Sequence, residues 1–298
     1  MGHDYLAFFM PKYRPPNDVH TSFAGKNIIV TGSNVGLGFE AAVKFVALGG
    51  SKVILGVRNV EKGQHAQKQI EKRTGKTGVT EVWQVDMGDY ESIKAFAKKA
   101  DTLDHLDIAV LNAGVYSTTY EQSKYGWEWT FQINTLSTVL LGLLLLPKLY
   151  ASKEVSIDKP ILEIVGSSRH VVAEIEPDQD ASENLLERFN HKEDFTGSRQ
   201  YQMSKLFVQY AMRKIAKLAV DKVTVLSVCP GPCKSELPRA YKSNPIVAIL
   251  INIIFFLFLR TTEQGSRTLV SGTIQGEKIH GGFWKDDIVQ PYVCYFFN

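Results

Sequence analysis

Six short apolar runs, rich in valine and isoleucine, alternate along this chain with segments of helical periodicity. The runs lie at residues 27–32 (NIIVTG), 52–58 (KVILGVR), 81–87 (EVWQVDM), 106–114 (LDIAVLNAG), 161–168 (ILEIVGSS) and 223–231 (VTVLSVCPG). Such runs are typical of strands buried on both faces, and residues 39–48 and 60–73 are predicted to be helices. The alternation predicts an α/β fold with a doubly wound parallel sheet of the Rossmann type, which binds ligands beyond the carboxyl ends of its strands.

The length and composition agree with one such domain. The chain has 298 residues and is 44% hydrophobic, which is enough for a single large core. We expect an N-terminal extension at residues 1–22 and one domain at residues 23–298. The formal net charge is only +3 and basic residues are mixed with acidic ones, so we expect no nucleic-acid partner.

The three cysteines are few and odd in number, and none has metal-ligand spacing. This usage predicts a reducing compartment and no metal site. The apolar patch near the start is interrupted by Pro11 and is too short for a signal peptide. We therefore expect a cytoplasmic protein.

Three glycines lie between the first run and the helix that follows, in IVTGSNVGLGFEAA at residues 29–42. Gly32, Gly36 and Gly38 would let a bulky anion approach the backbone, and the start of the helix offers N–H groups without partners. The pattern is neither G-x-G-x-x-G nor a P-loop with its Lys-Ser/Thr ending. These glycines alone are compatible both with a phosphate-binding loop and with a plain tight turn.

Arg58 follows the second run, at the distance from the glycine loop where a dinucleotide fold meets the adenosine ribose. An acidic residue there would accept the 2′-hydroxyl of NAD, whereas an arginine suits the 2′-phosphate of NADP. The alternative is that Arg58 is an ordinary solvated side chain that binds no cofactor. We expect NADP to be the cofactor.

Three motifs follow one another along the chain: TGSNVGLG at residues 31–38, NAG at 112–114 and YQMSK at 201–205. They resemble the TGxxxGxG cofactor loop, the mid-sheet motif and the YxxxK motif of the short-chain dehydrogenases/reductases. FAGKNIIVTGSNVGLG at 23–38, VRN at 57–59 and GGFWKDD at 281–287 further resemble the retinol-dehydrogenase-like branch, which includes fungal reductases of secondary metabolism. The resemblance extends over residues 23–284 and implies an NADP-dependent oxidoreductase.

The YxxxK pattern occurs four times, as Tyr90/Lys94, Tyr120/Lys124, Tyr201/Lys205 and Tyr210/Lys214. The first two pairs precede the fifth run, which is too early for the catalytic helix of the family. Tyr210 would point to nearly the opposite side of the helix from Tyr201. The resemblance therefore makes Tyr201 the acid in reduction and the base in oxidation. Lys205 is expected to bring the pKa of the phenol toward neutrality and to bind the nicotinamide ribose.

Two serines end the fifth run, and the family places a catalytic serine there. We align Gly166 and Ser167 with the Gly-Ser pair of the family, because His170 then falls where relatives of this branch carry histidine. Ser168 is the alternative. Asn134, in FQINTLS, matches the asparagine that bends its helix and anchors a water near the lysine, although an ordinary turn or capping asparagine would look the same.

Asp86 and Met87 match the family's adenine site, and Pro230, Gly231 and Ser235 match its carboxamide loop, in which Cys233 replaces the more usual valine. The residues expected to bind NADP are Gly32, Ser33, Asn34, Gly36, Leu37, Gly38, Arg58, Asn59, Asp86, Met87, Asn112, Ala113, Gly114, Tyr201, Lys205, Pro230, Gly231, Cys233 and Ser235. The expected catalytic set is Asn134, Ser167, Tyr201 and Lys205.

Two segments depart from the common pattern. Residues 171–197 lengthen the interval between Ser167 and Tyr201, and they either shape the substrate pocket, which we favour, or form a solvated acidic loop. Residues 246–259 are apolar apart from Asn252, but as a helix they would span about 21 Å, short of the roughly 30 Å of a bilayer core. They form either a buried helix or part of a substrate lid, at about 236–262, that also rests against lipid.

We adopt the lid, which predicts peripheral membrane contact and a lipophilic substrate. The most complete hypothesis is hydride transfer between NADP(H) and a lipophilic ketone, secondary alcohol or aldehyde, with a place in secondary metabolism. The alternatives are a relative recruited to cyclisation or isomerisation, and a non-catalytic dinucleotide sensor. LSTVLLGLLLLPKL at 136–149 and the Tyr201 helix resemble the homodimer interface of many relatives, although the same apolar stripe would serve as ordinary core.

Overall fold

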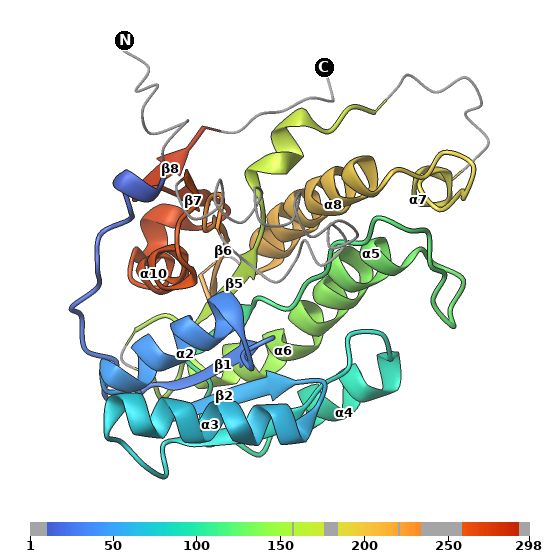
Figure 1. Ribbon diagram of the computed structural model, residues 1–298. Helices are drawn as coiled ribbons and strands as arrows, with labels where there is room; N and C mark the ends of the chain where they lie inside the picture. Colours follow the sequence, from blue (N-terminus) through green and yellow to red (C-terminus); the bar gives the residue numbers. More distant parts are fainter. Residues whose placement is uncertain (1–10, 157, 176–183, 220, 234–257, 292–298) are drawn as a thin grey trace.

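An eight-stranded sheet forms the centre of the computed structural model (Figure 1), which describes residues 11–156, 158–175, 184–219, 221–233 and 258–291. Its strands are β1 (Asn27–Thr31), β2 (Lys52–Val57), β3 (Thr80–Gln84), β4 (Ile108–Leu111), β5 (Ile161–Val165), β6 (Thr224–Cys229), β7 (Phe283–Lys285) and β8 (Ile288–Gln290). They are ordered β3-β2-β1-β4-β5-β6-β7-β8. The six predicted strands and the doubly wound parallel arrangement are confirmed.

The last two strands were not predicted. β7 continues the parallel sheet beside β6, and β8 returns antiparallel to β7. The two residues between them, Asp286 and Asp287, both have positive φ, at 53° and 58°. Positive φ at both central residues is the geometry of a tight hairpin turn that matches the twist of the strands. The sheet is therefore parallel except at this edge.

Helices cover both faces of the sheet. They are α2 (Gly36–Ala47), α3 (Val60–Thr74), α4 (Tyr90–Ala100), α5 (Trp129–Phe131), the π-helical turn η2 (Gln132–Ser137), α6 (Thr138–Ser152), α7 (Leu185–Arg188), α8 (Gly197–Leu218) and α10 (Thr262–Gly272), with 3₁₀ turns η1 (Pro11–Tyr13), η3 (Ser168–Val172) and η5 (Gly276–Ile279). One buried cluster joins α2, α3 and α10 to the sheet, and another joins α4, α6 and α8 to the opposite face. The two predicted helices are confirmed as α2 and α3; the start of α3 is as predicted, and the other ends differ by one to three residues.

The helices begin and end where the sequence offers caps. Asn59 caps α3 by accepting a hydrogen bond from the Lys62 amide, and Gly75 ends the helix in the left-handed conformation. Thr196 caps α8, the long helix that carries Tyr201. α10 begins with a capping box formed by Thr261 and Gln264.

The described part of the 171–197 segment packs beside α8. Phe189 is buried in a third apolar cluster with Phe131 and Phe207. The Asn190 side chain accepts a hydrogen bond from the Glu128 amide at 2.7 Å and donates one to the Gly126 carbonyl at 2.8 Å. This part of the segment therefore closes the outer side of α5 and α8, and it contributes no residue to the lining of the pocket described below.

Two further expectations can be placed on the structure. The expected lid falls mostly outside the described residues, which resume at Phe258, and so does Ser235. Trp129–Ser152 is the one described stretch of helix that is long and apolar enough to cross a membrane, but 67% of its most apolar 18-residue segment is buried inside the fold. A helix buried to that extent is typical of a protein core.

Candidate active site

A pocket of about 540 Å³ opens at the carboxyl ends of the central strands, where a doubly wound fold binds its ligands. The predicted residues that line it are Gly32, Asn34, Gly36, Leu37, Arg58, Asn59, Asp86, Met87, Asn112, Ala113, Gly114, Ser167, Tyr201, Lys205, Pro230, Gly231 and Cys233. Residues from all six predicted strand ends thus meet at one cavity, although they are spread over two hundred positions of the chain.

The glycine loop leaves no room for a side chain at Gly32 or Gly38. Gly32 has φ +65°, and a Cβ there would come 3.0 Å from the Ala113 Cα. A Cβ on Gly38 would come 2.5 Å from both the Asn112 side chain and the Gly32 carbonyl. Gly32 thus shapes the floor of the pocket, whereas Gly38 is a packing position that does not line it.

The N-terminus of α2 is left open toward this pocket. Its capping residue, Val35, has no side chain that could accept a hydrogen bond from the first turn. Val35, Gly36 and Leu37 all line the pocket. The uncapped N–H groups and the positive end of the helix dipole therefore provide a site that suits a phosphate group.

Asn112 joins the end of β4 to the glycine loop. Its side-chain amide donates to the Thr31 carbonyl at 2.8 Å and to the Gly32 carbonyl at 3.3 Å. The Thr31 hydroxyl accepts hydrogen bonds from the amides of Asn112 and Ala113, each at 3.0 Å. Thr31 was not among the predicted residues, yet it fixes the spacing between the two loops that form the pocket floor.

Two cations stand at the end of the pocket beside β2. Arg58 and Lys62 both line it and are exposed. Among the described residues, the Arg58 guanidinium forms no hydrogen bond or ion pair. Asn59 uses its side chain to cap α3, accepting from the Lys62 amide at 2.8 Å, and so fixes the backbone of the turn that carries Lys62. Lys62 was not predicted, although its position in the first turn after Arg58 was a usable signal.

The adenine-site candidates are held by their own hydrogen bonds. The Asp86 carboxylate accepts from the Gly88 amide at 2.8 Å, and the Asp86 amide donates to the Ser92 hydroxyl at 2.9 Å. The Met87 carbonyl accepts from the Ser137 hydroxyl at 2.5 Å. These contacts fix the backbone at the pocket wall beside Trp129, which also lines it.

At the other end of the pocket, the structure brings Ser167 to Tyr201. The Ser167 side chain lies close enough to the Tyr201 hydroxyl to lower the pKa of the phenol, and both residues line the pocket. Ser168 points elsewhere: its amide and its hydroxyl each lie 3.3 Å from the Cys229 sulfur, and it is not part of the lining. The geometry thus favours Ser167 over Ser168.

Lys205 is almost completely buried next to Tyr201. Its ammonium lies 5.8 Å from the centre of the Tyr201 ring and donates a hydrogen bond to the Val165 carbonyl at 2.8 Å. Burial lowers the pKa of Lys205 to about 8, because a buried ammonium loses its hydration. A charged Lys205 therefore requires either a pH below this value or a nearby anion.

The pKa of Tyr201 is shifted upward, which corrects the expectation that Lys205 would bring it toward neutrality. Burial raises the pKa of Tyr201 to about 12, and the neighbouring Ser167 side chain opposes this shift without reversing it. The phenol therefore keeps its proton at neutral pH. Sequence spacing places a lysine beside the tyrosine, but it does not reveal how completely both groups are removed from water.

Asn134 supports the site from behind rather than lining the pocket. It lies in the π-helical turn η2, where its side chain accepts from the Val115 amide at 2.8 Å and donates to the Val115 carbonyl at 2.9 Å. The same amide group donates to the Ser204 hydroxyl at 3.2 Å. Asn134 thereby ties the turn after β4 to the helix that carries Tyr201 and Lys205.

The other tyrosine–lysine pairs do not reach the pocket lining. Tyr90 stacks on Tyr125, with ring centres 4.1 Å apart. The Tyr120 hydroxyl donates to the Asn190 carbonyl at 3.0 Å, and the Tyr210 ring packs on Phe207. Of the remaining predicted residues, Ser33 is fully buried beneath the loop and does not line the pocket.

Sequence reasoning also missed two residues close to Tyr201. The Tyr116 ring packs edge-on against the Tyr201 ring, with centres 5.6 Å apart, and Cys229 lines the pocket beside Pro230. Tyr116 directly follows the NAG motif and its neighbour Val115, and Cys229 ends β6. Both belonged to segments identified as strand ends, but nothing in their residue types indicated contact with Tyr201.

Known proteins share both the sequence and the fold. Residues 26–157 match the model of the short chain dehydrogenase family. The chain is 43% identical to the short-chain dehydrogenase/reductase phmF of Phaeosphaeria nodorum over 95% of this chain and 83% of that protein. It is 40% identical to the short-chain dehydrogenase/reductase ffsI of Aspergillus flavipes over 94% and 83% of the two chains. The chain belongs to the short-chain dehydrogenase/reductase family.

Solved structures agree with this family membership at the level of the fold. The oxidoreductase yciK of E. coli superimposes with a TM-score of 0.66 at 21% identity, over 92% of this chain and 99% of that chain. A Shigella flexneri chain solved in complex with NADP gives a TM-score of 0.63 at 20% identity, over 91% and 100% of the two chains. This short-chain dehydrogenase/reductase is therefore an oxidoreductase by family, with the eight-stranded architecture described above.

Proposed function

We propose that this protein transfers a hydride between NADP(H) and a lipophilic ketone, secondary alcohol or aldehyde. The observation that carries the proposal is the arrangement of one pocket with Ser167, Tyr201 and Lys205 at one end and Arg58 and Lys62 at the other. Between them lies the open N-terminus of α2, which suits a pyrophosphate. These residues fit a dinucleotide that carries an additional phosphate.

The catalytic groups have the protonation states that reduction requires. When bound, NADPH would supply the hydride. Ser167 would donate a hydrogen bond to the carbonyl oxygen of the substrate, and Tyr201 would give its proton to the alkoxide that develops there. The high pKa of Tyr201 keeps that proton in place at neutral pH until the stronger base appears. Lys205 would stabilise the resulting phenolate by its charge.

The preference for NADP rests on Arg58 and Lys62. Both cations line the pocket beyond β2, and no described residue neutralises the Arg58 guanidinium. A 2′-phosphate could accept hydrogen bonds from both side chains, whereas the 2′-hydroxyl of NAD offers no charge to match. The structural neighbour from Shigella flexneri that was solved with NADP supports the same choice.

The lipophilic character of the substrate rests on the walls near Tyr201. Val115, Tyr116, Ile133 and Cys229 line the pocket, and the Tyr116 ring lies against the Tyr201 ring. An apolar group beside the reacting carbonyl would be buried there. A place in secondary metabolism belongs to the same proposal and rests on the sequence resemblance stated above.

The deciding experiment follows NADPH oxidation by absorbance with a panel of lipophilic ketones and aldehydes, and in parallel follows the loss of each substrate by mass spectrometry. Equal consumption of NADPH and substrate supports the proposal. Substrate loss without NADPH oxidation would favour cyclisation or isomerisation. Tight NADPH binding with no reaction in the presence of substrates from the native pathway would favour a dinucleotide sensor.

Association with other molecules is a separate part of the proposal. α6 exposes Leu143 and Leu144, with 41% and 36% of their surfaces accessible, on a helix made mostly of apolar residues. We propose that this face joins two copies of the chain in a homodimer located in the cytoplasm. Sedimentation of the purified protein at micromolar concentration tests the dimer, and a monomer would exclude it. Peripheral membrane contact depends on residues 246–257, which lie outside the described part of the chain.

A further inference from the structure

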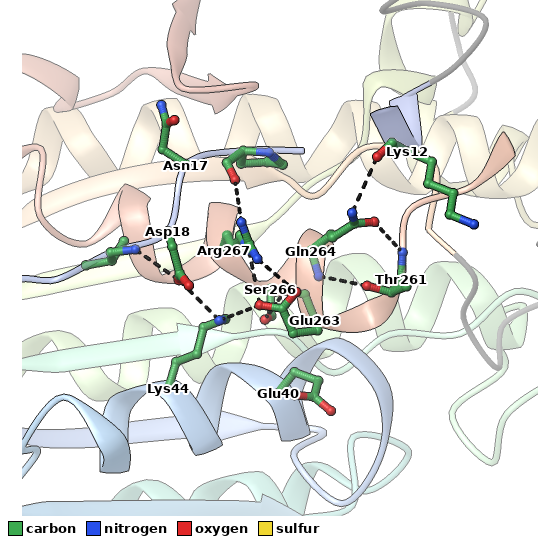
Figure 2. A network of polar contacts seen from close by, with 12 residues as sticks. Lys12, Asn17, Asp18, Glu40, Lys44, Thr261, Glu263, Gln264, Ser266 and Arg267 are labelled. Carbon is green, nitrogen blue, oxygen red and sulfur yellow. Dashed lines mark hydrogen bonds and ion pairs between the residues drawn. The ribbon is translucent and has the colours of Figure 1, made fainter. Parts of the chain in front are cut away.

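The N-terminal segment is fastened along α10 by a row of polar contacts (Figure 2). Gln264 donates to the Lys12 carbonyl at 3.4 Å, and Arg267 donates to the Pro16 carbonyl at 3.3 Å. The Asn17 amide donates to the Asp287 carboxylate at 2.6 Å, in the turn between β7 and β8. The segment at residues 12–19, called here the N-terminal strap, therefore contacts two elements that lie more than two hundred residues away in the sequence.

A chain of charges extends from the strap to the cofactor helix. Asp18 pairs with Lys44 at 3.3 Å, and Lys44 pairs with Glu263 at 2.7 Å. Glu263 in turn accepts from Arg267 at 3.1 Å. Figure 2 shows that these side chains lie between α2 and α10. The strap therefore contacts the last turn of α2, at the end of this helix that lies away from the pocket.

Arg260 makes a second and more direct connection. It is only 3% exposed, and within the described part of the chain its guanidinium contacts three separate parts of the fold. It donates to the strap at the Arg14 carbonyl, 2.8 Å away, and to the Pro230 carbonyl at 3.2 Å, and it pairs with the Asp286 carboxylate at 2.6 Å. The Arg260 amide also donates to the Pro232 carbonyl at 3.0 Å.

Pro230 and Gly231 belong to the pocket wall, so Arg260 lies directly behind the proposed cofactor site. Gly231 has φ +75°, and a Cβ on it would come 2.6 Å from the Arg260 guanidinium. The absence of a side chain at Gly231 is thus what allows the guanidinium to pack against the loop. Arg260 itself does not line the pocket.

We propose that Arg260 is a positioning residue that couples docking of the N-terminal strap to the shape of the Pro230–Gly231 loop, and thereby to the affinity for NADPH. The inference rests on the proposed function for its last step only. An arginine suits this role because its planar fork can contact the Asp286 carboxylate and two carbonyl oxygens at once. A buried guanidinium also holds these partners firmly, because losing one would leave a charge without compensation.

Arg267 provides a matched control, since it also holds the strap but does not contact the loop. Its described contacts are the Pro16 carbonyl and the Glu263 carboxylate. The comparison therefore uses full-length Arg260→Met and Arg267→Met, together with Arg260→Lys, which keeps the charge but loses the fork. Thermal melting shows whether each variant is folded. If Arg260→Met fails to fold, Arg260→Lys takes its place as the test variant.

Amide hydrogen exchange tests the coupling without any cofactor. Arg260→Met is expected to speed exchange both in the strap and at Gly231 and Cys233, whereas Arg267→Met is expected to speed it in the strap alone. Faster exchange in the strap with an unchanged loop in the Arg260 variant would overturn the proposal. So would equal effects of the two variants on the loop.

NADPH titration tests the last step. Arg260→Met is expected to raise the Kd for NADPH about fivefold or more, the lower end of typical coupling between sites, with kcat at saturating NADPH nearly unchanged. Arg260→Lys is expected to restore part of the affinity, and Arg267→Met to bind as the wild type does. An unchanged Kd in Arg260→Met would overturn the coupling to the pocket. A wild type that binds no NADPH would instead refute the proposed function, and the exchange result would still decide whether strap and loop are coupled.

Discussion

Ser167 lies beside the Tyr201 hydroxyl and lowers the pKa of that phenol, although the two residues come from the end of β5 and the first turns of α8. Its neighbour Ser168 is turned toward the Cys229 sulfur. In a short-chain dehydrogenase/reductase this contact places two hydroxyl donors next to one another, so that both can reach a single oxygen atom of the substrate. It also identifies which of two adjacent serines can take part in the reaction.

Replacing Ser167 with alanine should therefore lower kcat on the order of 100-fold or more, because a donor to the reacting oxygen is lost. Ser168→Ala is the matched control, and it should retain most of the activity. Steady-state turnover with saturating NADPH measures both. The opposite ranking of the two variants would contradict the alignment of Gly166 and Ser167 with the catalytic pair.

Tyr201→Phe should abolish turnover while leaving NADPH affinity nearly intact. The substitution removes the proton donor and hardly changes the shape of the side chain, so the pocket wall and its contact with Tyr116 remain. Turnover and an NADPH titration by fluorescence report the two effects separately. Substantial remaining turnover would exclude Tyr201 as the acid.

The pH profile of kcat/KM should report the protonation state of Lys205. Its pKa is lowered to about 8 by burial, so its ammonium form is present below that pH and is lost as the pH rises. Since kcat/KM reflects the free enzyme, its value for reduction should fall as the pH rises through about 8. Tyr201 should not contribute in this range, because its pKa lies at about 12. A profile that stays level well above pH 8 would refute a role for the Lys205 charge.

Arg58→Asp should reverse the cofactor preference. We expect the wild type to favour NADPH through a charge-assisted contact of about 1.5 to 3 kcal/mol, or roughly tenfold to a hundredfold in affinity. Lys62→Gln should weaken the preference without reversing it, because Arg58 remains. Titrations of all three proteins with NADPH and NADH make the measurement, and equal affinities in the wild type would remove the argument for NADP.

Glu163 should make stability depend on pH. It lies in β5 with no exposed surface, and neither carboxyl oxygen has a hydrogen-bond partner among the described residues. Burial raises its pKa well above the ordinary value, so the folded protein holds the proton more tightly than the unfolded chain does. Its contribution is therefore fully present below the unfolded pKa and is lost as the pH rises toward the folded pKa.

Glu163→Gln tests this directly, because glutamine keeps the shape and cannot ionise. The free energy of unfolding, measured in urea between about pH 5 and pH 8, should decline for the wild type and stay more nearly constant for the variant. Glu154→Gln, at an exposed position, serves as the control and should follow the wild type. Parallel curves for wild type and Glu163→Gln would show that the buried carboxyl does not titrate in this range.

The sequence predicted the elements that depend on local pattern. Strongly apolar runs identify strands buried on both faces, and the six central strands were found in this way. β7 and β8 were missed because each has only three residues, and the signal that joins them is a turn of two aspartates with positive φ. Such a turn more often contains glycine or asparagine, so its sequence did not suggest a hairpin.

The site residues that could be predicted are those that lie at strand ends or within recognisable motifs. What the sequence could not supply was burial and the direction of side chains. Lys205 could be placed beside Tyr201, but the pKa values of both depend on how far each is removed from water. Arg260 gave no signal at all, because its guanidinium partners among the described residues are backbone carbonyls and an aspartate from distant segments.

The valine at the start of α2 has a consequence for the lifetime of the protein. A helix without a capping side chain has a first turn that is less stable than it would be with serine or aspartate at that position. Under the proposed function, the bound dinucleotide would complete that turn and shift the folding equilibrium by mass action. Proteases act mainly on opened chains, so depletion of the total pool of this dinucleotide, oxidised and reduced together, would both stop the reaction and hasten removal of the enzyme. Val35 would in this way link the abundance of the protein to the metabolic state of the cell.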